Sequence, residues 1–276
     1  MDDIRKKISF EDLYIPGLPD TAVQIIAALE DDLCSVTKLE EVIYRDPALT
    51  AEVLKIVNAP FYASGKAISS VADTIMFIGL GNLVALVSVV ALTHQCMSGN
   101  IDKDVIRHLL AVSAAANELA GQADAAEIRR EVAVVAGLLH DIGKLILFES
   151  LPEEYELMKD EAIRSGRPFS AVEEEALGFN HCAVGAVLAE RWHLPPIYQY
   201  ALEHHHDKPI SADKLSEFDG LCYLIRVSDK MVLDAGIGLG VTTEMDLPRL
   251  LEVLGINQSA YDRVAKNVAG MKTLPV

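Results

Sequence analysis

The sequence predicts an all-α fold, a two-part helical bundle, on the basis of three observations. Apolar residues recur at helical spacing along most of the 276 residues. No segment shows sustained alternation of apolar and polar residues, and no Asn-Gly or Asp-Gly pair is flanked by such alternation. The composition is 51% hydrophobic, which is sufficient for a sizeable core in one large or two small domains.

The first half of the chain contains four stretches of helical periodicity. Their ranges are 22–29, 47–57, 71–78 and 83–92. The second stretch follows Asp46, a residue type that caps helices, and it has Pro47 in the first helical position. The last stretch is about half of the ~20 residues that a membrane-spanning helix needs. We therefore expect it to be a buried core helix, with no membrane insertion.

The second half is also helical, but it is more polar and contains most of the histidines. Its predicted helices cover 105–120, 127–149, 153–164, 171–177, 181–192, 197–205, 218–235 and 247–268. The last range is interrupted at Ile256-Asn257-Gln258, which indicates a short helix pair. Packing on the second half is the simpler role for this pair, and an interface is the alternative. The loop at 96–104 separates the halves, so we expect parts at 10–98, 102–236 and 244–276.

Charge and cysteine usage restrict the partners and the compartment. The 41 acidic and 24 basic residues give a formal charge of −17, and no long basic cluster is present. Nucleic acid and an anionic membrane surface are therefore not expected partners. The N-terminus has no apolar signal segment. The cysteines are scattered and form no C-x-x-C pair, which suits a cytoplasmic location and predicts neither a disulfide framework nor a zinc knuckle.

Histidine is distributed unevenly along the chain. One of the eight, His94, lies in the first half, and the other seven lie in the second. Five predicted helices of the second half each bring histidine or aspartate: His108, His140-Asp141, His181, His204–His206 and Asp229. Helical bundles build metal sites from side chains that converge in this way. Imidazole with carboxylate is a ligand set suited to iron, zinc, manganese or nickel.

The pair His140-Asp141 is the strongest single candidate in this set. Apolar residues surround it in every direction of the helix, so we expect the pair to be buried. A buried aspartate needs a cation or several hydrogen-bond donors. Lys144, three residues later, could be that cation, and a Lys144–Asp141 ion pair without a metal is the alternative.

The other members of the set have simple alternatives of their own. His108 could be a hydrogen-bonded or surface histidine, and Asp229 could lie on a solvated helix face. His204–His206 could be a solvated helix end, because imidazolium suits the negative pole of the helix dipole.

Taken in order, His108, His140-Asp141 and Asp229 resemble the H…HD…D signature of HD-superfamily metal-dependent phosphohydrolases. The stretch "LLHDIGKL" is close to the common form of that motif. In the first half, "IPGLPDTAVQIIAAL", "VIYRDPALTAEVLKIVNAPFY" and "AISSVADTIMFIGLGNLVAL" resemble the HDOD domain, a bacterial signalling relative of HD. Thr74 departs from the usual alanine. The resemblance covers roughly residues 10 to 235.

The resemblance implies an HDOD-type N-terminal half packed on an HD-like half, with one or two divalent metal ions in the latter. The implied ligands are His108, His140, Asp141, His181, His205, His206 and Asp229. In the triple histidine, the family pattern favours His205 and His206, with His204 at a variable position. Lys144 matches a lysine that contacts phosphate in catalytic relatives. Many HDOD proteins have lost these ligands, whereas this chain keeps a suitable residue at every position.

Two functions follow from these expectations. In the first, the chain is a signalling module that binds partner proteins and holds a metal or nucleotide as a structural or sensory ligand. In the second, it is a metal-dependent phosphohydrolase in which Asp141 or Asp229 orients the attacking water and Lys144 stabilises charge on the phosphoester. The HH pair is not followed by Gly-Tyr-Pro, so hydrolysis of cyclic di-GMP is not implied. We favour the signalling module.

Overall fold

A computed structural model describes most of the chain. The described residues are 9–31, 33–58, 68–97, 103–124, 128–206, 215–239, 241 and 244–273. They contain α- and 3-10 helices and no β-strand, which confirms the all-α prediction. The predicted domain limits at residues 98, 102 and 276 lie outside the described residues, so the domain division stays a prediction.

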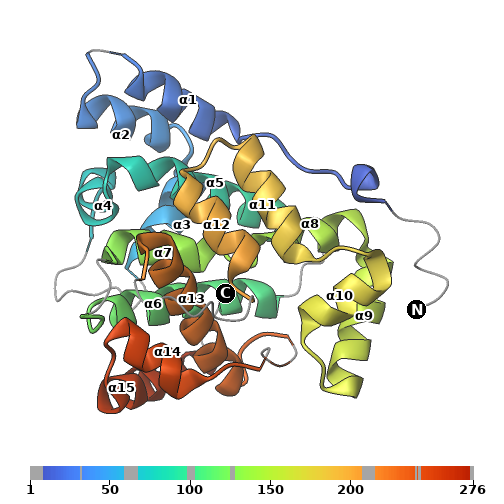
Figure 1. Cartoon of the computed structure of the whole chain (residues 1–276). Helices are drawn as coiled ribbons and strands as arrows, with labels where there is room; N and C mark the ends of the chain where they lie inside the picture. Colours follow the sequence, from blue (N-terminus) through green and yellow to red (C-terminus); the bar gives the residue numbers. More distant parts are fainter. Residues whose placement is uncertain are drawn as a thin grey trace.

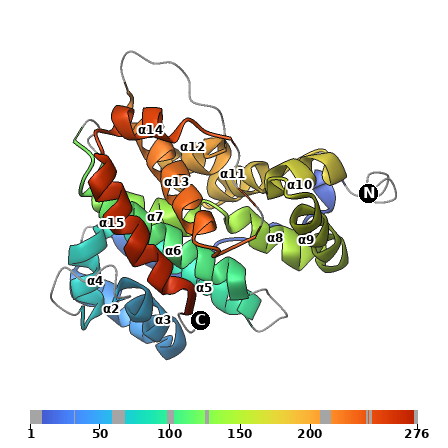
Figure 2. The same ribbon diagram turned by 90° about the horizontal axis from the view of Figure 1, so that it is seen from below.

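Many consecutive helices are separated by only a few residues (Figure 1). In chain order they are η1 (Phe10–Asp12), α1 (Asp20–Leu29), α2 (Val36–Tyr44), α3 (Pro47–Val57), α4 (Val71–Ile78), α5 (Leu80–Met97), α6 (Lys103–Ala120), α7 (Arg130–Leu139), α8 (Ile142–Ser150), α9 (Pro152–Ser165), α10 (Phe169–Leu177), α11 (His181–Arg191), α12 (Pro196–His204), α13 (Glu217–Asp234), α14 (Leu247–Leu254), α15 (Gln258–Ala269) and η2 (Gly270–Thr273). Helices α2, α3 and α4 gather at one end of the molecule, and α9 and α10 lie at the other (Figures 1 and 2).

Capping residues explain where the helices of the N-terminal part begin. Ser35 accepts a hydrogen bond from Lys38 N, and Asp46 accepts one from Leu49 N, with Pro47 in the first turn as predicted. Sequence periodicity does not predict α2, although the structure forms it. Its buried face has only Leu39, Val42 and Ile43, and charged residues occupy much of the rest.

Helix α5 connects the two parts of the bundle. It packs on α1, α3 and α4 and also on α7 and α8. Many of its own side chains are apolar and buried, as expected for a core helix, and these include Leu83, Leu86, Val87, Val89 and Val90. Within the described residues, no single helix is long and apolar enough to cross a membrane. Among the same residues, α4 and Asn82–Thr93 of α5 would be long and apolar enough together, but the chain bends by 118° between these two segments.

The second part is organised around α6, α7 and α13, which all contact one another. Helix α12 packs on α7 and α13, and α11 packs on α8 and α12. The C-terminal pair packs here too, as predicted: α15 lies along α6 (Figure 2), where Arg263 and Asn267 donate hydrogen bonds to Gln122 and Glu118.

The prediction of one helix over 127–149 is wrong. Helix α7 ends at Leu139 and α8 begins at Ile142, so His140 and Asp141 form the junction between two helices. Two glycines beside this junction allow close packing. A Cβ on Gly137 would lie 2.4 Å from the Cα of Ser113 in α6, and a Cβ on Gly143 would lie 2.0 Å from the carbonyl oxygen of His181 in α11. Periodicity does not reveal the break because both helices are apolar on nearly every face.

Candidate metal centre

The structure brings together all seven residues that the sequence nominates as metal ligands. They come from α6, the α7–α8 junction, α11, the C-terminal end of α12 and α13. His140, Asp141, His181 and His205 have no exposed surface, and the remaining three are buried or half-buried. These side chains therefore form an internal polar cluster within an apolar bundle, while their role as ligands stays a prediction.

Asp141 lies between two groups of histidines. Its Oδ1 atom is 3.0 Å from Nε2 of His181 and 3.6 Å from Nε2 of His205. Its Oδ2 atom is 3.3 Å from Nε2 of His108 and 3.4 Å from Nε2 of His140. Each carboxylate oxygen thus faces a different pair of imidazoles.

The first group consists of His108, His140 and Asp229. The Oδ1 atom of Asp229 lies 3.1 Å from Nε2 of His108 and 3.9 Å from Nε2 of His140. The two Nε2 atoms are 3.3 Å apart. The three ligand atoms therefore enclose a space of the size that a single ion occupies.

The second group consists of His181, Cys182, His205 and His206. Nε2 of His181 and Nε2 of His206 are 3.1 Å apart. Sγ of Cys182 lies 3.9 Å from both ring nitrogens of His205. Ligand atoms of all four side chains lie within 4.8 Å of one another.

Hydrogen bonds on the far side of the rings fix how the imidazoles are oriented. Nδ1 of His108 faces the carbonyl of Ile237 at 3.1 Å. Nδ1 of His140 and of His205 face the carbonyls of Gly137 and Leu202, each at 2.9 Å. A carbonyl can only accept, so each Nδ1 must carry the proton and a neutral ring then directs its Nε2 lone pair into the cluster. Metal-binding histidines commonly have this second hydrogen bond.

Glu173 gives His181 the same support. Its Oε2 atom accepts hydrogen bonds from the backbone N–H of His181 and from Nδ1 of the ring, the latter at 2.5 Å. Glu173 is fully buried. A carboxylate behind an imidazole raises its basicity and fixes its orientation, so Nε2 of His181 also points into the cluster.

The cluster is suited to divalent cations. Oδ1 of Asp141 and Oδ1 of Asp229 are buried and make no hydrogen bond. Two neutral imidazoles whose Nε2 atoms face each other cannot hydrogen-bond without an added proton. A cation between them would satisfy the nitrogen lone pairs and the carboxylate oxygens together. The residues present therefore fit a divalent transition metal.

In the absence of a metal, protons balance the buried carboxylates. Burial lowers the pKa of His108, but the neighbouring carboxylates of Asp141 and Asp229 raise it more, to about 9. Burial likewise lowers the pKa of His205, but the charge of Cys182 and the nearby carboxylate of Asp141 raise it to about 10. Burial also lowers the pKa of His181, but the charge of Glu173 raises it well above its usual range. Imidazolium groups thus accompany the buried carboxylates at neutral pH.

Lys144 provides a further positive charge. Its Nζ atom pairs with Oδ2 of Asp141, as in the metal-free alternative. Burial raises the pKa of Asp141, but the charges of Lys144 and His140 hold it well below its usual range. Because Lys144 contacts only one of the two oxygens, the ion pair leaves Oδ1 directed at His181 and His205.

His204 is separate from the cluster, in agreement with the expected register. Its ring packs on that of Tyr200, with centroids 4.5 Å apart, and its Nε2 atom lies 3.9 Å from Glu203. His205 and His206 are the members of the triple histidine that join the second group.

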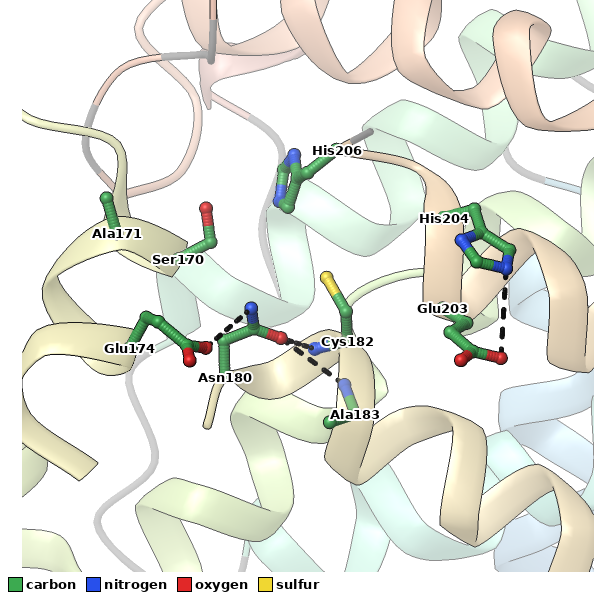
Figure 3. A pocket seen from close by; sticks show the side chains of 9 residues that line it. All are labelled: Ser170, Ala171, Glu174, Asn180, Cys182, Ala183, Glu203, His204 and His206. Atoms are coloured by element: carbon green, nitrogen blue, oxygen red, sulfur yellow. Dashed lines mark hydrogen bonds and ion pairs between the residues drawn. The ribbon is translucent and has the colours of Figure 1, made fainter. Parts of the chain in front are cut away.

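A solvent-accessible pocket adjoins the second group (Figure 3). Its cavity volume is about 480 Å³. The lining residues are Ser170, Ala171, Glu174, Asn180, Cys182, Ala183, Glu203, His204 and His206. Figure 3 shows the Cys182 thiol directed toward the side of the pocket where His206 lies. The lining includes two glutamates and neither lysine nor arginine among the described residues.

Sequence reasoning did not identify Glu173 and Cys182. Glu173 lies among three consecutive glutamates, and nothing in the sequence separates it from its neighbours. Cys182 belongs to no pair of cysteines, and the only signal is its position directly after His181.

Comparisons with known proteins agree with this architecture. A solved HDOD domain protein with unknown function from Geobacter sulfurreducens has a TM-score of 0.66 and 22% identity, over 95% of this chain and 94% of that one. A candidate signal transduction protein from Marinobacter aquaeolei VT8 has a TM-score of 0.69 and 23% identity, over 98% of this chain and 62% of that one. A candidate phosphohydrolase from Shewanella amazonensis SB2B has a TM-score of 0.61 and 21% identity, over 93% and 91%. At these identities the likeness establishes the fold.

Two comparisons rest on sequence. An uncharacterized protein of Treponema pallidum (strain Nichols) is 25% identical over 205 residues, which is 71% of this chain. The chain spans 38% of the length of that relative. The family model of the HDOD domain matches residues 15–208, well over half of the sequence. The chain belongs to the HDOD domain family.

Proposed function

We propose that this HDOD protein is a regulatory module of bacterial signal transduction that holds one or two divalent transition-metal ions. Iron, manganese, zinc and nickel suit the donor set. The observation that carries the proposal is the position of Asp141, whose two oxygens face two separate groups of imidazole nitrogens. An accidental polar cluster would not need to direct four Nε2 atoms at one carboxylate.

The proposal assigns ligands to two positions. The first would use His108, His140, Asp229 and Oδ2 of Asp141, and the second would use His181, His205, His206 and Oδ1 of Asp141. Bound divalent ions would supply Lewis acidity. They would also lower the pKa of a water molecule bound to them to near neutrality. The hydrogen bonds of His108, His140, His181 and His205 to their carbonyl or carboxylate partners hold the rings ready for this role.

Regulatory action through partner proteins is supported by the related Marinobacter protein, which is a signal transduction candidate. A nucleotide or another phosphoester is the small ligand we expect beside the metals.

A metal-dependent phosphohydrolase is the second candidate function, and Lys144 favours it. Lys144 is buried, pairs with Asp141 and is held under the ring of Phe169, with Nζ 5.8 Å from the ring centroid. When Asp141 is engaged by metal, the ammonium group would be released to stabilise a phosphoester oxygen. Asp141 or Asp229 would orient the attacking water. The pocket beside His206 gives access from solvent.

Metal analysis of purified protein tests the proposal. The wild type and a His140→Ala/Asp141→Ala double variant are stripped with chelator, reconstituted with each divalent metal in turn and desalted. His204→Ala is the matched control, because His204 adjoins the cluster without joining it. We expect one or two ions per chain in the wild type and the control. A wild type that retains no more metal than the double variant overturns the proposal.

The same proteins separate the two functions. Reconstituted wild type is incubated with phosphomonoesters, nucleotides and cyclic dinucleotides, and phosphate release is measured. Turnover that the double variant abolishes identifies a hydrolase. A metal-loaded wild type that binds nucleotide or a partner protein without turnover identifies a regulatory module.

A further inference from the structure

We propose that Cys182 is an additional ligand of the second metal position, where it joins three histidines and Oδ1 of Asp141. The inference rests on the proposed function, because it concerns the same metal cluster. It goes further by assigning a thiolate to one position and by making the two positions chemically different.

The distances around Cys182 suit a shared ion. Ligand atoms of a tetrahedral ion with nitrogen and sulfur donors lie roughly 3.3–3.6 Å apart, as follows from the usual metal–ligand bond lengths. The Nε2 atoms of His181 and His206 are 3.1 Å apart, and Sγ of Cys182 is 3.9 Å from both ring nitrogens of His205. Small side-chain movements would bring the four donors to bonding geometry.

The start of α11 holds Cys182 in place. The side chain of Asn180 accepts hydrogen bonds from the backbone N–H groups of Cys182 and Ala183, at 3.0 and 3.3 Å. Asn180 in turn donates to Glu174 in α10 at 3.3 Å (Figure 3). The first turn of a helix also favours an anionic group, and this stabilises a thiolate there. Cys182 is therefore positioned by the N-cap of α11, which Glu174 of α10 supports.

Asp141 supplies an independent indication of a cation at this position. Its Oδ1 atom is buried and makes no hydrogen bond, yet it lies 3.0 Å from Nε2 of His181 and 3.6 Å from Nε2 of His205. Lys144 is paired with the other oxygen. An unsatisfied carboxylate oxygen directed at the same imidazoles as the thiol points to a bound cation rather than to a thiol that merely fills space.

A thiolate would change which metal the second position prefers. Soft sulfur with imidazole favours zinc or iron over manganese, whereas the first position offers only imidazole and carboxylate. The two positions would then fill with different affinities. Cys182 is buried but lines the pocket, so we expect small thiol reagents to reach it from there when no metal protects it.

Cobalt(II) is the probe for a spectroscopic test, because a thiolate bound to cobalt gives an intense charge-transfer absorption in the near ultraviolet. Wild type, Cys182→Ser and the control Cys34→Ser are stripped and titrated with Co²⁺ alone, and bound cobalt is quantified separately. We expect the band in the wild type and in Cys34→Ser and its loss in Cys182→Ser. One of the two equivalents of Co²⁺ should bind about tenfold or more weakly in Cys182→Ser than in the wild type.

The outcomes distinguish this inference from the proposed function. If the wild type binds cobalt without the band, or if Cys182→Ser retains the band, Cys182 is not a metal ligand. Neither result contradicts the proposed metal centre. Wild type that binds no cobalt overturns both. Circular dichroism of each variant reports whether the fold is intact.

A second measurement uses only the wild type and so does not depend on a variant that folds. The protein is alkylated with iodoacetamide with and without Zn²⁺, and modification of the peptide that contains Cys182 is followed by mass spectrometry. We expect Zn²⁺ to slow its alkylation about tenfold or more, while Cys34 reacts at an unchanged rate. Equal rates at Cys182 in the two conditions overturn the proposal.

Discussion

Glu173 in α10 accepts two hydrogen bonds from His181 at the start of α11, one from the backbone N–H at 3.0 Å and one from the imidazole Nδ1 at 2.5 Å. This contact orients a proposed metal ligand from behind and joins two helices. It is the clearest case in which a residue outside the seven nominated ligands controls the cluster.

Glu173→Gln should weaken metal binding at the second position. The amide is a poorer acceptor than the carboxylate, so Nε2 of His181 becomes less basic and the ring loses its fixed orientation. We expect the affinity for one of the two equivalents of Co²⁺ to fall about 10- to 100-fold, as measured by calorimetric titration. Glu175→Gln serves as the control, because Glu175 pairs with Arg167 instead. Unchanged affinity in Glu173→Gln would show that Glu173 does not support His181 as a metal ligand.

Gly143→Ala should separate α8 from α11. The added Cβ would lie 2.0 Å from the carbonyl oxygen of His181, which is backbone and cannot move alone. We expect the free energy of unfolding to fall by about 1–3 kcal/mol or more, together with weaker metal binding. Gly270→Ala is the control, because no atom lies within 4 Å of its added Cβ. Denaturant titration compares the two, and equal stability would contradict the packing described.

Lys144→Met should destabilise the metal-free protein and should make its stability depend more strongly on metal. Removing the ammonium leaves the buried charge of Asp141 without its partner, which costs about 3–5 kcal/mol in buried ion pairs. A bound cation would replace the lost charge. Thermal unfolding with chelator and with Zn²⁺ should therefore show a larger metal-induced rise in Tm than in the wild type. The same small rise in both proteins would favour a purely structural Lys144–Asp141 pair.

Metal affinity should increase with pH. In the metal-free protein His108 has a pKa of about 9 and His205 has a pKa of about 10. Both rings are therefore in the protonated imidazolium form at neutral pH. A metal must displace these protons, and this becomes easier as the pH approaches 9. Titrations with Co²⁺ between pH 6 and pH 9 should show a steady rise in affinity with proton release. Affinity that is independent of pH would contradict binding at these imidazoles.

The stability of the metal-free protein should change in the opposite direction. The folded-state pKa of His108 is raised above its unfolded value near 6.5, so its contribution is complete below that pH. The contribution is lost progressively as the pH rises toward 9. Thermal unfolding in chelator should therefore show Tm falling across this range, and a flat profile would argue against the imidazolium–carboxylate contacts.

The fold class and the seven clustered residues could be predicted from the sequence because both depend on strong local patterns. The apolar run of α5 and the cap at Asp46 are examples from the fold. The motif around His140-Asp141, with histidine or aspartate on four other helices, is the example from the cluster.

Other features depend on tertiary contacts that leave no local trace. The break at His140-Asp141 is stabilised by the close packing of Gly137 on α6 and Gly143 on α11, and both glycines occupy ordinary helical positions. Glu173 is distinguished from its two neighbouring glutamates only by which one faces His181. Cys182 gains its significance only when α11 packs beside the end of α12.

Anomalous X-ray scattering from crystals of metal-loaded protein, collected on both sides of the metal absorption edge, tests the central claim most directly. The account predicts one or two anomalous peaks within bonding distance of the Asp141 carboxylate, one beside His108 and His140 and the other beside His181 and His205. The absence of a peak at Asp141, with Lys144 still paired to its carboxylate and metal bound elsewhere on the surface, would contradict the account.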